Sequence, residues 1–181
     1  KTAMTINEVC GSGLKAIILA SQAIRLGDAR TIVVGGTESM SQAPYLLPNQ
    51  RWGSKIGDIN AIDSLVHDGL TDAFDQQHMG ITAETVAERF QVSREEQDAF
   101  ALHSQLKATA AQEEGYFKQE IAPVILTDRK NHQTVVAEDE YIRKDVTIES
   151  LSKLRSAFQK NGTVTAGNAS GINDGAAALV L

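Results

Sequence analysis

A helical pattern followed by an apolar β-branched run constrains this chain more than any other feature. From Ser12 onward, apolar and small residues recur at three- and four-residue spacing along one face, and Gly27 stands where a left-handed residue would end the helix. The run "TIVVGG" follows, as expected for a strand buried on both faces of a parallel sheet. With the short, weakly alternating stretch "TAMTINEV" ahead of the helix, the pattern predicts a βαβ unit and an α/β fold.

Cys10 is the only cysteine in the chain, and it falls at the corner between the first predicted strand and the predicted helix. The free N–H groups and the positive dipole end of a helix favour the thiolate, which is the nucleophilic form of cysteine. Glycines at positions 11 and 13 would let a substrate carbonyl approach the backbone, so the N–H of Cys10 could form half of an oxyanion hole. Simple burial as a small apolar residue is the alternative.

Composition excludes several classes of protein. The net charge of -6 argues against a nucleic-acid partner, which would require a basic stripe. No run approaches the roughly 20 apolar residues of a membrane span, so no membrane partner is expected. A single cysteine cannot form an internal disulfide, which favours a reducing, cytoplasmic location. Both ends look cut, because the chain starts at Lys1 rather than Met and stops inside the strand pattern "AAALVL".

The middle of the chain predicts an insertion with its own helices. Residues 41–70 form an apolar, proline- and glycine-punctuated excursion that either packs on the same chain or meets another subunit. Helices are predicted over 82–90 and 93–115, the second with Ser93 and Glu96 in capping-box spacing. A small hairpin over "IAPVIL" and "QTVVAE", a helix over 147–158 and a glycine-rich loop lead to a final strand.

Four histidines are candidate bases for a nucleophilic cysteine. His78, which precedes a glycine at a predicted helix entrance, is the best candidate among them. The other three are interpreted as surface residues or as residues with ordinary hydrogen-bond partners: His67, His103 and His132.

Seven motifs in order resemble the thiolase family across essentially the whole chain: "NEVCGSGLKA", "GGTESMSQAP", "DGLTDAF", "HMGITAE", "SREEQDAFALHSQ", "DEYIR" and "GTVTAGNASGINDGAAA". The likeness is greatest to the acetyl-CoA acetyltransferases, the short-chain branch. The resemblance implies part of a thiolase-like αβαβα layered fold with an inserted α+β loop domain and an incomplete sheet. It implies a nucleophile-bearing core over 1–39, a loop domain over 40–172 and a return strand over 173–181.

The same resemblance implies acyl transfer between CoA thioesters in a cytoplasmic enzyme of fatty acid and ketone metabolism. Cys10 matches the thiolase nucleophile, which takes an acetyl group from acetyl-CoA before a second acetyl-CoA attacks to give acetoacetyl-CoA and CoA. The steps run in reverse as thiolysis. The expected partners are acetyl-CoA and acetoacetyl-CoA, with CoA entering as part of the substrate and with no metal or permanently bound cofactor.

Seven residues match family positions that bind CoA: His78, Met79, Arg143, Ser150, Phe158, Ala166 and Ser170. By this likeness His78 and Met79 line the pantetheine and acyl pocket, and Phe158 forms its wall. Arg143 and Ser150 lie near the adenosine end, while Ala166 and Ser170 border the pantetheine arm. A surrounding set of cations would supply positive charge for the CoA phosphates: Arg129, Lys130, Arg143, Lys144, Lys153 and Arg155.

The chain departs from the family pattern where the acid/base groups are concerned. Thiolases complete the site with an Asn-Glu-Ala-Phe loop, a Gly-His-Pro histidine and a second cysteine, and these 181 residues contain no such histidine motif or cysteine. The chain is therefore expected to hold the nucleophile without finishing the reaction, within a homodimer or homotetramer. Two alternatives stay open: a non-catalytic acyl-CoA-binding module, and a cysteine-dependent thioester hydrolase with His78 as its base.

Overall fold

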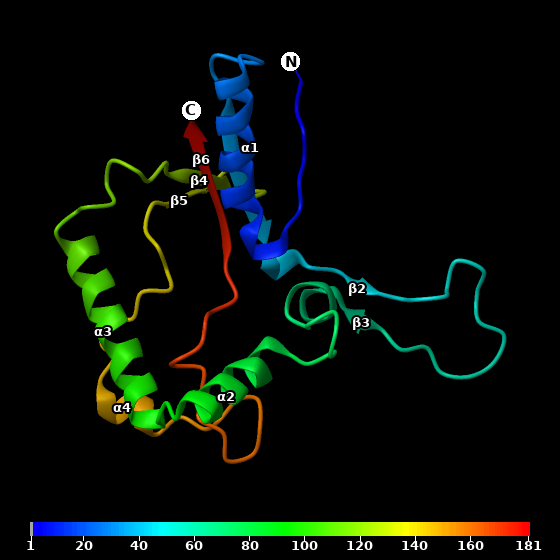
Figure 1. Cartoon of the computed structure of the whole chain (residues 1–181), viewed down its shortest axis with the longest axis vertical. Coiled ribbons are helices and arrows are strands. Elements are labelled where there is room, and N and C mark those ends of the chain that lie inside the picture. Colours follow the sequence, from blue (N-terminus) through cyan, green and yellow to red (C-terminus); the bar gives the residue numbers. More distant parts are fainter. Residues whose placement is uncertain (1) are drawn as a thin grey trace. The chain divides into compact units, whose positions relative to one another are not determined.

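The structure is a computed structural model that describes residues 2–181 and mixes helices with short sheets (Figure 1). It divides into two compact units. The first comprises the residues up to Gln76 together with Ile172–Leu181, and the second is Gln77–Gly171. The resemblance predicts domains over 1–39, 40–172 and 173–181, and these bounds stay a prediction. In this structure residues 40–76 group with the first unit.

The first unit contains the predicted helix and its following strand. Helix α1 spans Ser12–Leu26 and ends at Gly27, whose φ of 82° is left-handed and whose N–H bonds back to the last turn. Strand β1, Val33–Ser39, pairs antiparallel with β6, Asp174–Val180, in a register that runs from Val33↔Val180 to Ser39↔Asp174. The predicted helix, its glycine cap and both strands are therefore confirmed.

The predicted βαβ unit and parallel sheet are wrong for this structure. Residues 2–8 carry no strand, because no other described segment offers them a ladder. The strand β1 pairs only with β6 among the described residues, and β6 arrives in the opposite direction. Val34 is the one buried residue of β1, so the strand is not covered on both faces. An apolar β-branched run predicts a strand, but the direction of its partner is set elsewhere in the chain.

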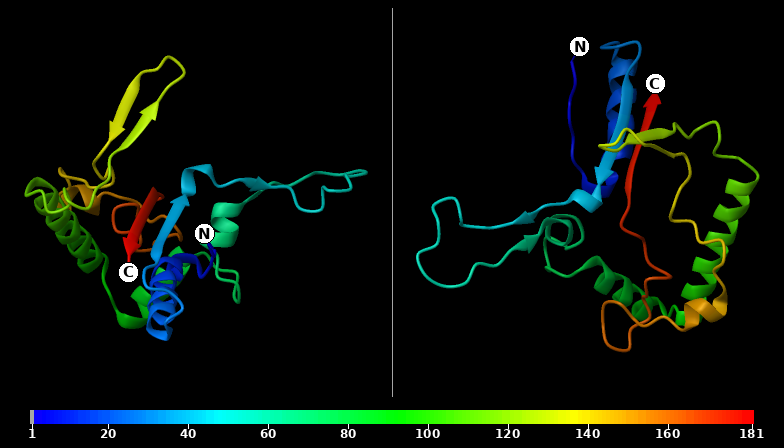
Figure 2. Two further views of the ribbon diagram at one scale, coloured as in Figure 1. Left: turned by 90° about the horizontal axis from the view of Figure 1, so that it is seen from above. Right: turned by 180° about the vertical axis from the view of Figure 1, so that it is seen from behind.

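The apolar excursion forms an arm closed by two short strands. Strand β2, Tyr45–Leu46, pairs antiparallel with β3, Ile62–Asp63, and a π-helical turn over Leu65–Gly69 follows (Figure 2). Trp52 and Ile56 lie in the intervening loop and are 93% and 95% exposed. The loop therefore does not bury these side chains against the described part of its own chain.

The second unit is built from two helices, a hairpin and a final short helix. Helices α2, Met79–Phe90, and α3, Arg94–Glu113, are followed by β4, Val124–Thr127, β5, Gln133–Val136, and α4, Ile148–Ser152. The strands pair antiparallel from Val124↔Val136 to Thr127↔Gln133, which confirms the predicted hairpin.

The last predicted helix is shorter than the sequence pattern suggests. Thr147 caps it as expected, but α4 ends at Ser152 rather than at residue 158. Ser156 instead pairs with Thr165, and the N–H of Ala157 donates to the carbonyl of Val164 at 2.9 Å. These long-range backbone bonds replace the last turns of the predicted helix.

Among the described residues, Val9–Leu26 is the one helical stretch long and apolar enough to cross a membrane by length and composition. The sequence alone had predicted no run of this length. Core helices of soluble proteins and N-terminal signal sequences share this length and composition, so the stretch does not by itself indicate a membrane span. The expected absence of a membrane partner stays a prediction.

The cap of α3 generates a first prediction about stability. The Ser93 hydroxyl accepts from the N–H of Glu96, whose carboxylate accepts from the N–H of Ser93 at 2.8 Å. Replacing Ser93 by Ala removes one side of this box and should lower the free energy of unfolding by about 1 kcal/mol in chemical denaturation. Ser104→Ala, at an exposed position in the middle of α3, is the control and should change it by less than about 0.5 kcal/mol. Equal effects of the two variants would contradict the capping role.

Candidate functional site

Cys10 lies in the 3-10 turn Val9–Gly11, directly before α1, and is exposed. Three side-chain hydrogen bonds help to fix this turn: the Asn7 side chain accepts from the N–H of Val9 at 2.8 Å, and the Ser12 hydroxyl accepts from the N–H of Glu8 and donates to the Val9 carbonyl. A reagent can therefore reach the sulfur, while the backbone around it is held by local hydrogen bonds. The alternative of a cysteine simply buried in the core does not fit this position.

Val9, the residue before the cysteine, adopts a left-handed backbone with φ of 51°. A β-branched residue in this region costs about 1–3 kcal/mol and persists only where its surroundings hold it. The side chains of Asn7 and Ser12 hold Val9 in this conformation, because they bond to its N–H and its carbonyl. Strain of this kind gathers at functional sites, which points to the corner at Cys10.

His78 caps helix α2 through its ring. Its Nδ1 accepts from the N–H of Gly80 at 3.0 Å, so in the neutral ring the proton resides on Nε2. The ring stacks on Phe158, with centroids 4.9 Å apart and an interplanar angle of 27°. A side chain at position 80 would overlap the Phe158 ring, so the glycine there allows this ring to pack against the start of α2. The structure thus brings together two of the predicted CoA-binding residues.

The other predicted residues of the second unit lie on its surface. Met79 begins α2 and is 52% exposed, and Arg143 is exposed with its N–H bound to the Gln105 side chain at 2.8 Å. The Ser150 hydroxyl accepts from the N–H of Thr147 at 3.0 Å, which makes it part of the capping box of α4, and it donates to the Thr147 carbonyl at 2.7 Å.

Ala166 and Ser170 are exposed members of one loop, residues 163–170, which we call the AGNAS loop after its sequence. The Tyr141 hydroxyl donates to the Ala169 carbonyl at 3.2 Å, which ties the segment that carries Arg143 to this loop. The predicted adenosine-end and pantetheine-arm residues are therefore linked through one side chain.

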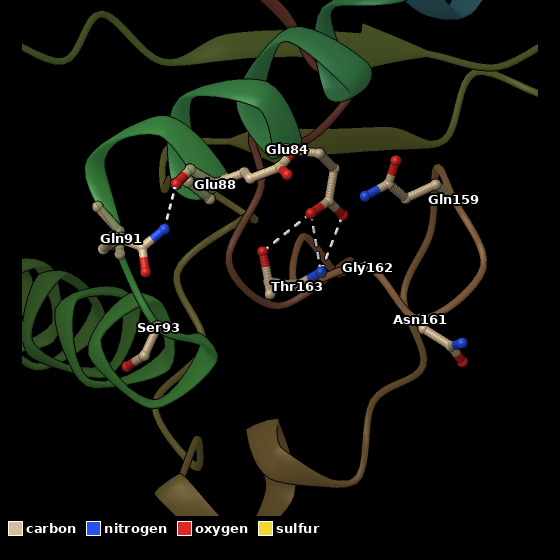
Figure 3. Close-up of a pocket in the computed structure, with 10 residues that line it drawn as sticks. Glu84, Glu88, Gln91, Ser93, Gln159, Asn161, Gly162 and Thr163 are labelled. Carbon is tan, nitrogen blue, oxygen red and sulfur yellow. Dashed lines mark hydrogen bonds between the residues drawn. The ribbon is translucent and has the colours of Figure 1, made fainter.

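Sequence reasoning missed a buried carboxylate beneath the AGNAS loop. Glu84 of α2 is only 5% exposed, and it accepts from the N–H and hydroxyl of Thr163 at 2.9 Å (Figure 3). It also accepts from the N–H of Val164 at 2.8 Å. A cavity of about 460 Å³ adjoins it, between the end of α2, the start of α3 and residues 159–163. Glu84 lies on the same face of α2 as Gly80 and Ala87, at a spacing that is visible in the sequence, but its burial depends on Thr163 and Val164, which are distant in the sequence.

Burial by itself disfavours the charged form of Glu84. The donated bonds from Thr163 and Val164 outweigh it and hold the pKa of Glu84 below its ordinary value of 4.5. The side chain is therefore a carboxylate at neutral pH, and its charge is compensated by hydrogen-bond donors of the loop.

A second buried carboxylate, Asp98 of α3, is 2% exposed. It accepts from Arg94 Nε at 2.7 Å and from Asn168 Nδ2 at 3.0 Å. Asn168 also accepts from the N–H of Thr165 at 2.7 Å, so this carboxylate reaches the AGNAS loop through a side-chain amide. The four-residue spacing of Arg94 and Asp98 is visible in the sequence, but their long-range partner is not.

In the part of the chain that the structure describes, no cluster of three or more His, Cys, Asp or Glu side chains could hold a metal ion. The expected absence of a metal and of a permanently bound cofactor stays a prediction.

Comparison with known proteins places this geometry in a family. The model of the thiolase N-terminal domain matches residues 1–181. The chain belongs to the thiolase family. A "Probable acetyl-CoA acyltransferase" of Staphylococcus aureus strain COL is 56% identical, and an "Acetyl-CoA acetyltransferase" of Chromobacterium violaceum is 55% identical. Each alignment covers 99% of this chain and 46% of the relative, so the chain spans just under half the length of these proteins.

Solved thiolases share the fold of this chain. Human mitochondrial 3-ketoacyl-CoA thiolase superposes with a TM-score of 0.92 at 47% identity, over 99% of this chain and 45% of that one. The same enzyme in complex with CoA gives a TM-score of 0.90 at 47% identity, over 98% of this chain and 44% of that one. These matches confirm an α/β thiolase fold and the family resemblance found in the sequence.

The charge of Glu84 generates a prediction about pH. Because its folded-state pKa is lowered, its contribution to stability is present above pH 4.5 and is lost as pH falls through the folded pKa. Glu84→Gln should lower the free energy of unfolding at pH 7 by about 1.5–3 kcal/mol, since bonds to a charged acceptor are lost. Denaturant unfolding at a series of pH values from 7 to 3 should show that the difference in free energy of unfolding between wild type and Glu84→Gln shrinks at the acid end. Glu88→Gln, exposed on the same helix, is the control, and a gap that stays constant with pH would contradict the assignment.

Proposed function

We propose that the chain is the nucleophile-bearing part of a thiolase that transfers acetyl groups between CoA thioesters through an acetyl-cysteine at Cys10. The observation that carries this proposal is an exposed, solitary thiol in a strained turn before α1, in a chain that belongs to the thiolase family. Relatives named acetyl-CoA acyltransferase and acetyl-CoA acetyltransferase support acyl transfer from CoA thioesters. The finer assignment is condensation of two acetyl-CoA to acetoacetyl-CoA and CoA, together with its reverse, in the cytoplasm.

In this proposal Cys10 attacks the thioester carbonyl of acetyl-CoA. Its sulfur forms a bond to the acetyl carbon, and CoA leaves as the thiolate that takes up the proton released from Cys10. The backbone N–H of Cys10 is one candidate donor to the oxyanion. A base from outside these 181 residues removes an α-proton from the second acetyl-CoA, the enolate carbon bonds to the acetyl carbon, and the bond of that carbon to the Cys10 sulfur breaks, which releases acetoacetyl-CoA and restores the thiolate.

The CoA-binding roles of the seven residues remain part of the proposal. Stacking of His78 on Phe158 supports a shared wall for the acyl and pantetheine pocket. The link from Tyr141 to Ala169 supports a continuous surface for the CoA arm from Arg143 to Ser170. The groups that perform the acid/base steps in thiolases are absent from this sequence, so the 181 residues alone are expected to show negligible turnover.

The structure also bears on the hydrolase alternative. His78 uses Nδ1 to cap α2, so that nitrogen could accept a proton only by giving up the bond to Gly80. A histidine whose ring orients a helix and stacks on Phe158 fits a binding role better than that of a base.

Acetylation of Cys10 is the direct test of the proposed function. The full-length protein incubated with acetyl-CoA should gain one acetyl group, located at Cys10 by peptide mass spectrometry, and Cys10→Ala should gain none. An unchanged acetyl mass shift in Cys10→Ala would overturn the assignment. Binding of CoA without labelling would favour the non-catalytic module. Release of free acetate without an acceptor CoA, lost in His78→Ala, would favour the hydrolase.

We further propose that the protein is a homodimer or homotetramer and that the arm closed by β2 and β3, residues 45–63, takes part in the assembly. Large apolar side chains at a loop tip, such as Trp52 and Ile56, are characteristic of subunit contacts. The paired change Trp52→Ser and Ile56→Ser should lower the fraction of the highest oligomer in sedimentation velocity at least severalfold. The matched control is Phe74→Ser, which removes another side chain that is 97% exposed but outside the arm. Equal distributions for both proteins would refute the role of the arm.

A further inference from the structure

The AGNAS loop is held from below by two buried carboxylates that come from different helices. Glu84 of α2 accepts from the first two residues of the loop, Thr163 and Val164. Asp98 of α3 accepts from Asn168, in the middle of the loop. The contacts are direct in the first case and pass through one amide side chain in the second.

Asn168 carries the second contact deep into the loop backbone. Its Nδ2 donates to Asp98 and to the Thr163 carbonyl at 3.1 Å, and its Oδ1 accepts from the N–H of Thr165. The hydroxyl of Thr165 in turn accepts from the N–H of Gly167 at 3.1 Å. The backbone N–H groups of residues 163 and 164 therefore end on Glu84, and that of residue 165 ends on Asn168, which Asp98 holds.

The same contacts decide which side of the loop faces outward. Val164 and Thr165 are 5% and 0% exposed, whereas Ala166 and Ser170 are exposed. Gly167 packs so closely on Leu151 and Leu154 that a side chain there would overlap them. The loop thus presents Ala166 and Ser170 as the outer rim of a surface whose inner side is tied down.

We propose that Glu84 and Asp98 are positioning residues for the CoA pantetheine arm, acting through the AGNAS loop; this inference rests on the proposed function. Neither carboxylate touches the ligand. Their effect is to keep Ala166 and Ser170 in the shape that accepts the arm, so that binding does not have to order the loop.

The two carboxylates differ in how their charge is compensated. Asp98 is paired with Arg94, whose Nη2 also donates to the Leu151 carbonyl at 2.6 Å. Within the described residues Glu84 forms no ion pair, and its charge relies on donors of the loop: the N–H and hydroxyl of Thr163 and the N–H of Val164. Removing the Glu84 charge therefore acts on the loop first, whereas removing the Asp98 charge also releases Arg94.

The test compares the two halves of CoA in the full-length protein. Affinity for CoA is measured by calorimetry, and inhibition constants for pantetheine and for 3′-phosphoadenosine 5′-diphosphate are measured in the acetylation of Cys10. Glu84→Gln should weaken CoA and pantetheine roughly tenfold, because a loop that is seldom in the binding shape lowers the apparent affinity by that fraction. The nucleotide half should lose less than twofold. Asp98→Asn should follow the same pattern.

Three controls separate positioning from general damage. Glu88→Gln and Glu95→Gln make the same charge change at exposed sites on α2 and α3 and should leave all three constants within twofold. Ala108→Gly weakens α3 about three turns beyond Asp98, so it tests whether lower stability alone moves the constants. Every protein is assayed well below its own unfolding midpoint.

Each result decides the matter. Selective loss of the pantetheine half in Glu84→Gln, absent in Ala108→Gly, supports the proposal. Equal loss of both halves, or unchanged affinity for CoA, overturns it while leaving the proposed function intact. A wild-type protein that neither binds CoA nor is acetylated at Cys10 overturns the proposed function, and the positioning roles fall with it.

Discussion

The carboxylate of Glu84 is the constraint on which the second unit depends. A buried charge is tolerated only when donors surround it, and here the donors are the N–H and hydroxyl of Thr163 and the N–H of Val164. Helix α2 thereby fixes a segment about eighty positions further along the chain. The same helix is capped by His78, so one element both organises the AGNAS loop and carries a candidate binding residue.

Local patterns predicted most of the secondary structure. The spacing from Ser12 to Gly27, the capping box at Ser93 and the hairpin over β4 and β5 all proved correct, because each is determined by residues close together in the sequence. The parallel sheet and the last turns of α4 were wrong. Both depended on partners distant in sequence, namely β6 for β1 and Thr165 for Ser156, and no local pattern encodes such a choice.

For the candidate site, the sequence indicated which residues take part but not how they contact one another. Cys10 stood out as a solitary thiol at a corner, and the family motifs indicated the seven binding positions without giving their contacts. The stack of His78 on Phe158 could not be foreseen from residues eighty positions apart. The burial of Glu84 and Asp98 was not predicted, because acidic residues on amphipathic helices are usually exposed to solvent. Only their long-range partners Thr163 and Asn168 explain why these two are buried.

The ribbon of β1 and β6 has only Val34 buried among its fourteen residues. A two-stranded ribbon in water is marginally stable, since it has little apolar area to shield its backbone hydrogen bonds. The amide hydrogens of this ribbon are therefore expected to exchange with solvent sooner than those of α2. Local opening of this ribbon therefore requires less free energy than opening of the helices of the second unit, whose buried side chains include Glu84 and Asp98.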